Sequence, residues 1–225
     1  GSLYMAHSAN DLYEGDLVLN CQSAGSIRFG DSGVGTSTMA TGTRLAIGAL
    51  GFNSGGLYLR NFVHLSTLPQ QLEMGSATLF HTRAGTTFEG PLHVEAGQVS
   101  LAGSVFQRDA TFIQTSDVTS TSPGGNSFNG TTTLTLRGLG GLYMAETNGD
   151  AYNGDLRFNN LGTGHLRFGS SGNASSVLAA GRTMAVGAQG FATGQLWFRN
   201  FRQEGGLPQE LLLGDATILY YNGGN

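Results

Sequence analysis

The sequence predicts an all-β protein built as a parallel β-helix, or β-solenoid, of roughly eleven rungs of ~20 residues each. Three observations predict this fold. Gly makes up 37 of the 225 residues, whereas charged residues reach only 12%. Short runs alternate apolar and polar residues between Gly, Asn and Asp. The chain also repeats itself, at a long and at a short period.

The composition excludes several other classes of protein. Interior Gly costs a helix roughly 1 kcal/mol relative to Ala, so a helical bundle does not fit. Collagen needs Gly at every third position, and a disordered chain does not carry 39% hydrophobic residues. The 11 basic residues form no cluster and the net charge is −4, so we expect no nucleic-acid partner. No apolar run approaches the ~20 residues of a membrane helix, so we expect no membrane insertion.

The long repeat covers the whole chain. Residues 1–86 align without a gap to residues 140–225, at an offset of 139 (140 − 1), and about two in five pairs are identical. We therefore expect residues 1–139 to form a first copy of about seven rungs. Residues 140–225 form a partial second copy that is continuous with the first. Neither end shows a polar cap, so we expect a window of a longer array.

A shorter unit lies inside the long repeat. It begins with aromatic-x-Gly and a short alternating run, as in Phe88-Glu89-Gly90 and Phe128-Asn129-Gly130. Its second half is Gly-x-apolar-x-apolar, as in residues 97–101 and 164–168. Alternation with a period of two is typical of strands, and Gly and Asn are turn residues. The aromatic positions 88, 106, 128 and 152 are 18, 22 and 24 residues apart, which favours turns of about 20 residues.

The spacing of this unit decides the expected architecture. A unit of ~20 residues cannot bury its apolar face alone, but it can do so by stacking on a similar neighbour. Tandem β-sandwich repeats are the alternative. Asn-Gly dipeptides begin at residues 129, 148, 153 and 222, and they are typical of hairpins between antiparallel strands, so this alternative stays open.

Paired Asp residues recur between the two copies. Asp11 and Asp16 return as Asp150 and Asp155, close to Gly turns. Such carboxylates either stabilise the turns by side-chain hydrogen bonds or hold Ca²⁺. Two carboxylates fall short of the 6–8 oxygen ligands of Ca²⁺ unless backbone carbonyls supply the rest. We therefore predict no metal or cofactor site, and leave calcium as an open alternative.

No residue pattern supports catalysis. Gly30-Asp31-Ser32-Gly33 resembles the segment around a serine nucleophile, but its copy, Gly169-Ser170-Ser171-Gly172, lacks the Asp. The five His recur as His at no aligned position. We predict no catalytic residues and no enzymatic activity.

Aromatic and Arg positions do recur. Arg28 and Arg60 return as Arg167 and Arg199, each between apolar positions and hence on the outward side of a strand. We expect solvated charges paired with a neighbouring rung, with a ligand-binding Arg ladder as the alternative. Tyr4 returns as Tyr143 and Tyr58 as Trp197. These residues are expected either to form an exposed strip for sugar or surface binding, or to pack between sheets or solenoids.

Two segments carry a resemblance to a known family. Residues 128–135 (FNGTTTLT) and 190–197 (GFATGQLW) resemble the repeat region of giant secreted adhesin-like β-solenoid surface proteins of Bacteroidota. The resemblance implies an extracellular or cell-surface location, and it assigns no functional residues.

The leading functional hypothesis is a structural segment of a long extracellular fibre or adhesin stalk. Its partners would be neighbouring repeats or copies of the same chain, assembled end to end or laterally. A carbohydrate- or surface-binding module is the second hypothesis, in which the partner is a carbohydrate or another cell surface. A polysaccharide-degrading β-helix enzyme is the third.

Overall fold

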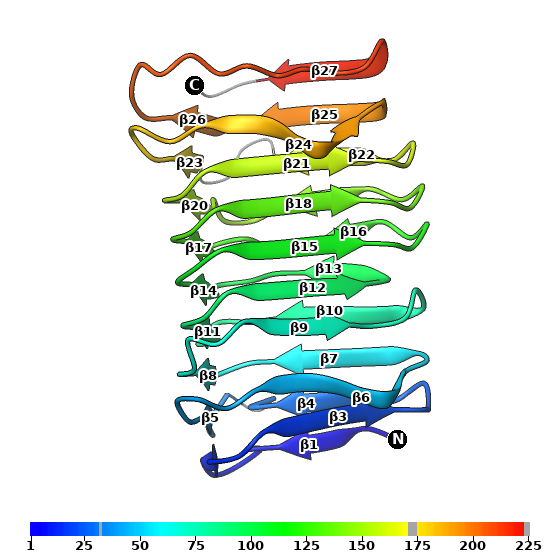
Figure 1. Ribbon diagram of the computed structural model, residues 1–225, viewed down its shortest axis with the longest axis vertical. Helices are drawn as coiled ribbons and strands as arrows, with labels where there is room; N and C mark the ends of the chain where they lie inside the picture. Colours follow the sequence, from blue (N-terminus) through cyan, green and yellow to red (C-terminus); the bar gives the residue numbers. More distant parts are fainter. Residues whose placement is uncertain (32, 171–174, 223–225) are drawn as a thin grey trace.

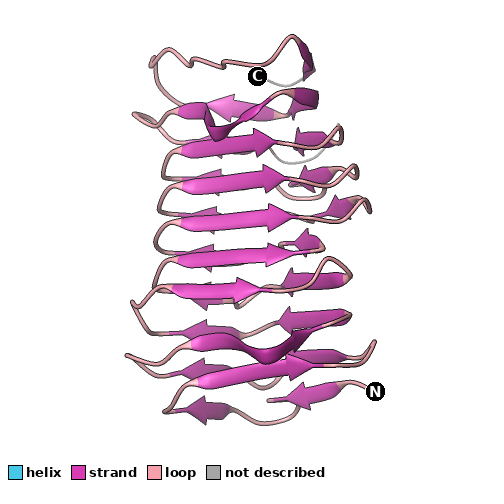
Figure 2. Ribbon diagram, turned by 45° about the vertical axis from the view of Figure 1, so that its right-hand side comes forward, coloured by secondary structure: helices cyan, strands magenta, loops and turns pink. Residues whose placement is uncertain are grey.

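The computed structural model describes residues 1–31, 33–170 and 175–222. Its strands stack into one elongated column, and the described part of the chain contains no helix (Figure 1). Each turn adds one strand to each of three faces (Figure 2). All the paired strands run parallel, so the β-solenoid is confirmed, whereas tandem sandwiches of antiparallel strands are wrong for this chain.

Three faces run along the column, and within each sheet a strand pairs with the strand of the next turn. The first face contains β1 (Leu3–Met5), β4 (Ser26–Phe29), β7 (Gly55–Leu59), β10 (Thr78–Thr82) and β13 (Gln98–Ser100) in one sheet, then β16 (Ser120–Thr121), β19 (Leu142–Met144), β22 (His165–Phe168), β25 (Thr193–Arg199) and β27 (Ala216–Asn222) in another. The second face contains β2 (Asp11–Tyr13), β5 (Ser37–Met39), β8 (Phe62–His64), β11 (Thr87–Phe88), β14 (Val105–Phe106), β17 (Ser127–Phe128), β20 (Ala151–Tyr152), β23 (Ser176–Leu178) and β26 (Phe201–Gln203). The third face contains β3 (Leu17–Cys21), β6 (Leu45–Phe52), β9 (Gln70–Glu73), β12 (Leu92–Ala96), β15 (Ala110–Gln114), β18 (Thr132–Leu136), β21 (Leu156–Asn160) and β24 (Met184–Phe191).

The turns are fewer and longer than the sequence suggested. The second face has nine strands within the described residues, and so about nine turns replace the expected eleven. The number of residues in a turn varies. Phe80 pairs with Val99, 19 residues later (99 − 80), whereas Ile27 pairs with Leu57, 30 residues later (57 − 27). The aromatic-x-Gly spacing covered only the shorter turns in the middle of the chain.

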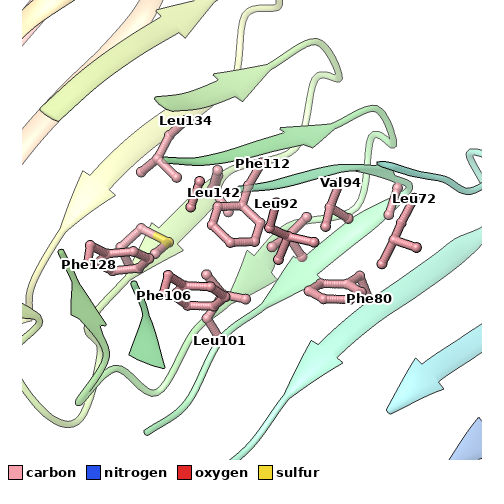
Figure 3. Packing of buried hydrophobic residues seen from close by; sticks show 14 of the residues in the cluster. Leu72, Phe80, Leu92, Val94, Leu101, Phe106, Phe112, Phe128, Leu134 and Leu142 are labelled. Atoms are coloured by element: carbon pink, nitrogen blue, oxygen red, sulfur yellow. The ribbon is translucent and has the colours of Figure 1, made fainter. Parts of the chain in front are cut away.

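An aromatic stack forms the inner side of the second face. Phe88, Phe106, Phe128 and Tyr152, the aromatic residues of the short repeat, are completely buried or nearly so. Successive rings lie 6.1, 5.1 and 5.1 Å apart and within 9° of parallel. Figure 3 shows Phe106 and Phe128 against Phe112 of the third face. Each turn therefore packs its aromatic ring on the same ring of the next turn, in one continuous core.

Close approach between turns explains the Gly that follows the aromatic residue. A Cβ on Gly130 would lie 2.3 Å from the carbonyl carbon of Arg108, and one on Gly154 would lie 2.1 Å from the carbonyl oxygen of Gly130. Both contacts are with backbone of the preceding turn, which cannot move aside. Gly is therefore required at these two positions, where the column turns from the second face to the third.

The two 30-residue turns each contain a bulge that the long repeat preserves. Pairing between β3 and β6 shifts register after Leu19, and pairing between β21 and β24 shifts after Phe158. The Asn20 side-chain oxygen accepts hydrogen bonds from the Leu50 and Gly51 amides, both at 3.1 Å. Asn159, its copy, accepts one from the Gln189 amide at 3.0 Å. One Asn, exposed at position 20 and buried at position 159, thus holds the extra residues of each bulge.

His64 occupies an aromatic position of the core, and replacing it tests the stack. Its ring packs 5.7 Å from Phe88, and burial lowers its pKa below 6.5. A lowered pKa in the folded state means that His64 contributes stability above pH 6.5, which is lost as the pH falls. We expect His64→Phe to raise the free energy of unfolding by about 1 kcal/mol at neutral pH, and by more at pH 5.

Urea denaturation at pH 7.5 and pH 5 measures this effect. His93→Phe, on the outward side of β12, is the matched control and is expected to give no gain. An equal gain from both variants, or no pH dependence, would contradict the assignment.

Candidate functional site on the first face

One row of side chains runs along the outside of the first face. Strand register places one residue from each turn opposite the residue of the next turn. The members, which we call the outer row, are Tyr4, Arg28, Tyr58, His81, Ser100, Thr121, Tyr143, Arg167, Trp197 and Tyr220. We expected the recurring Tyr and Trp residues to form a strip, and Arg28 and Arg167 to lie on the outward side of their strands. All of these residues lie in this one row.

In the first copy the outer row is a continuous stack. The Arg28 guanidinium carbon lies 4.2 Å from the ring centre of Tyr58 and 5.8 Å from that of Tyr4. The Tyr58 and His81 rings lie 5.2 Å apart. Cation–π contacts of this kind contribute about 0.5–2 kcal/mol. Both faces of Tyr58 are therefore covered by its neighbours.

The second copy repeats the stack with a larger aromatic residue. Arg167 lies 3.8 Å from the ring centre of Tyr143, and Trp197 stacks on Tyr220 at 4.1 Å. Arg199 lies 4.6 Å from the ring centre of Trp197. Between the two stacks the row contains only Ser100 and Thr121, so the aromatic segments are separated by two turns with small side chains.

Both Arg of the outer row have an acidic partner, but the two acids occupy different positions. Arg28 pairs with Asp31 at 3.0 Å within its own turn. Arg167 donates through Nε to Glu146 of the preceding turn at 2.9 Å. Glu146 aligns with His7 rather than with an acid, so the repeat alignment did not reveal this pair. The expectation of charges paired with a neighbouring rung is confirmed at Arg167.

His81 extends the row as a neutral acceptor. The Arg83 Nε donates to His81 Nε2 at 2.9 Å. Burial, together with the nearby Arg83 and Arg28 charges, lowers the pKa of His81 to about 4. The imidazole is therefore uncharged at neutral pH, and it leaves the positive charge of this segment to the Arg residues.

The paired Asp residues accept hydrogen bonds at turns. Asp16 accepts from the Arg44 amide at 2.8 Å, and its copy Asp155 accepts from the Thr183 amide at 2.9 Å. Each bond links one turn to the next. Asp11 accepts from Tyr13 at 3.2 Å, and burial, with Asp11 beside it, raises the pKa of Tyr13 to about 12. All these contacts fit the turn-stabilising role, one of the two alternatives raised by the sequence.

Asp150 is more deeply buried than its copy Asp11. The backbone amide and side-chain amide of Asn126 both donate to Asp150 Oδ1 at 2.9 Å, and Tyr152 donates to Oδ2 at 3.4 Å. Burial raises the pKa of Asp150 to about 7, although these hydrogen bonds oppose the rise. This difference was not predictable from the repeat, because it depends on Asn126 of the preceding turn.

The remaining candidates from the sequence do not assemble. Asp31 pairs with Arg28, whereas Ser32 and Ser171 of the Gly/Ser motif lie outside the described residues. Among described residues, no group of three or more His, Cys, Asp or Glu is placed to hold a metal ion. Residues 1–31, 33–170 and 175–222 also include no helix that could cross a membrane.

The fold and the outer row define a repeat protein of the parallel β-solenoid class. Comparison of the chain with protein-family models, with curated proteins and with solved structures gives no match.

Proposed function

We propose that this chain is a structural segment of a long extracellular fibre or adhesin stalk. The observation that supports this most is that the second copy continues the first without a break. Leu3 pairs with Ile27 in the first copy as Leu142 pairs with Leu166 in the second. The 139-residue repeat is therefore an axial repeat, and identical stacking can extend the column indefinitely.

The apolar packing at β27, compared with the same positions of the first copy, supports the same proposal. A cavity of about 170 Å³ there is lined by Met184, Phe198, Phe201, Gln203, Leu211, Leu219 and Tyr221. Their counterparts in the first copy are Leu45, Leu59, Phe62, His64, Leu72, Phe80 and Thr82, all buried. There the next turn, with Phe88, covers them. Each turn of this solenoid therefore buries the apolar residues of the turn before it.

The location and the partners follow from the resemblance of residues 128–135 and 190–197 to adhesin-like repeats. In this proposal the partners are neighbouring repeats or copies of the chain. Antibody labelling of intact producing cells, without permeabilisation, tests the location. Labelling only after the cells are opened would contradict it.

A series of chains with one, two and four complete copies of residues 1–139 tests the fibre. Electron microscopy is expected to show rods that lengthen by about 29 Å per copy, since six interstrand steps of ~4.8 Å lead from β1 to β19. Particles whose length does not scale with copy number would overturn the proposal.

A further inference from the structure

Positive charge gathers on the first face, although the chain carries a net charge of −4. Five of the 11 Arg lie in strands of this face or directly after them: Arg28, Arg60, Arg83, Arg167 and Arg199. Two of them form ion pairs with Asp31 and Glu146. The other three form no ion pair with a described residue, so the first face keeps an excess of positive charge.

A pocket lies around one of these unpaired Arg residues. It has a volume of about 260 Å³ and is lined by Tyr143, His165, Arg167, Trp197 and Arg199. These residues come from β19, β22 and β25, three successive turns. Arg199 Nε and His165 Nδ1 are buried and have no hydrogen-bond partner among the described residues. The described residues therefore leave hydrogen-bonding capacity unused beside this pocket.

The chemistry of this pocket selects an anion. A guanidinium forms paired hydrogen bonds with carboxylate and sulfate groups, and partial burial strengthens them. Glu146 already neutralises Arg167, so Arg199 supplies the charge for a ligand. Tyr143 and Trp197 line the same pocket and provide apolar contact for a ring carrying the anionic group.

We propose that the first face binds an acidic polysaccharide, with a carboxylate or sulfate of one sugar unit held at Arg199 in this pocket. A nucleic acid is the competing polyanion. Single strands bind by stacking bases on open aromatic faces. Here Arg167 covers Tyr143, and Trp197 and Tyr220 cover each other. An acidic polysaccharide can be held by charge-assisted hydrogen bonds that need no open ring face, so the row favours a polysaccharide.

The repeat also suits a polymer. Tyr4, Arg28, Tyr58 and Arg60 occupy the aligned positions of the first copy, six turns and about 29 Å away along the column. Between these two segments the outer row contains only the small side chains of Ser100 and Thr121, which do not obstruct a polymer. A polymer lying along the first face can therefore reach both segments, which raises its apparent affinity above that of a short oligosaccharide.

Binding of the full chain to immobilised polysaccharides tests the proposal. We expect binding to alginate, a polyuronate, or to dextran sulfate, and no binding to neutral dextran. The better of the two acidic polymers identifies carboxylate or sulfate as the preferred group. Arg199→Gln is expected to lower the affinity about tenfold or more, because it removes charge-assisted hydrogen bonds.

Arg157→Gln is the matched control, since Arg157 is exposed on β21 of the third face, one strand before β22. It is expected to leave binding within about twofold, because Arg157 lies outside the pocket. Arg60→Gln provides a second variant, in the first copy, and is expected to weaken long polymers more than short ones. Thermal unfolding verifies that each variant is folded.

Several outcomes would overturn the proposal. These are equal losses in Arg199→Gln and Arg157→Gln, equal binding to neutral dextran, stronger binding to single-stranded DNA, or no binding to either acidic polymer. None of these outcomes bears on whether tandem copies form rods.

Discussion

Phe128→Ala is expected to lower the free energy of unfolding by about 3–5 kcal/mol. Phe128 is completely buried between Phe106 and Tyr152, with ring centres 5.1 Å away on either side. Removing it leaves a cavity and interrupts the stack in the middle of the column. Each turn of a solenoid gains its stability from its neighbours, so the loss affects both interfaces of this turn.

Equilibrium urea denaturation measures the loss. Thr133→Ala, on the outward side of β18, is the matched control and is expected to change stability by no more than about 0.5 kcal/mol. A loss below ~1 kcal/mol in Phe128→Ala would show that the aromatic stack is not what joins the turns.

Asp150→Asn is expected to stabilise the protein at neutral pH but not at pH 4. The pKa of Asp150 rises from 3.8 to about 7 on folding, because burial disfavours the carboxylate. A raised pKa in the folded state means that the stability is fully present below pH 3.8 and is lost as the pH rises toward 7. The shift of about three units corresponds to roughly 4 kcal/mol. The Asn oxygen retains an acceptor for Asn126.

The difference in unfolding free energy between variant and parent, measured at pH 4, 6 and 8, tests this prediction. We expect it to grow from near zero to several kcal/mol over that range. Asp11→Asn, at the partly exposed copy of the position, is the control. A difference that is independent of pH would show that Asp150 is ionised throughout. As the pH falls below 6.5, the lowered pKa of His64 reduces the stability of the folded protein, whereas the raised pKa of Asp150 increases it. The pH dependence of the parent protein therefore does not separate the two effects.

The sequence predicted the fold because the features that determine it are local and repeated. The aromatic-x-Gly pattern marks the inner stack at Phe88, Phe128 and Tyr152, and Phe106 continues this stack with Arg108 in place of the Gly. The number of turns was harder to predict, because the bulges at β6 and β24 depend on Asn20 and Asn159, each in the turn before. A count based on the shorter middle turns missed these additional residues.

The outer row was predictable residue by residue, whereas its pocket was not. Alternation placed Arg28, Tyr58 and their copies on the outward side. The pocket at Arg199 combines residues from three turns, and their separation depends on turn lengths that the sequence did not reveal. The partner of Arg167 was missed for the same reason, since Glu146 lies 21 residues away and in a position that the first copy fills with His7.

The unequal turns have a consequence for a chain under tension. The hydrogen bonds between turns lie along the axis of the column. A force applied to the two ends therefore breaks the bonds of one turn at a time, and the turns detach in succession. A detached turn of 19 residues adds about 65 Å to the tether, and one of 30 residues adds about 105 Å. The bulged turns, held by Asn20 and Asn159, therefore release the longest segments. In a stalk they would act as extensible links that recur once in every 139-residue repeat.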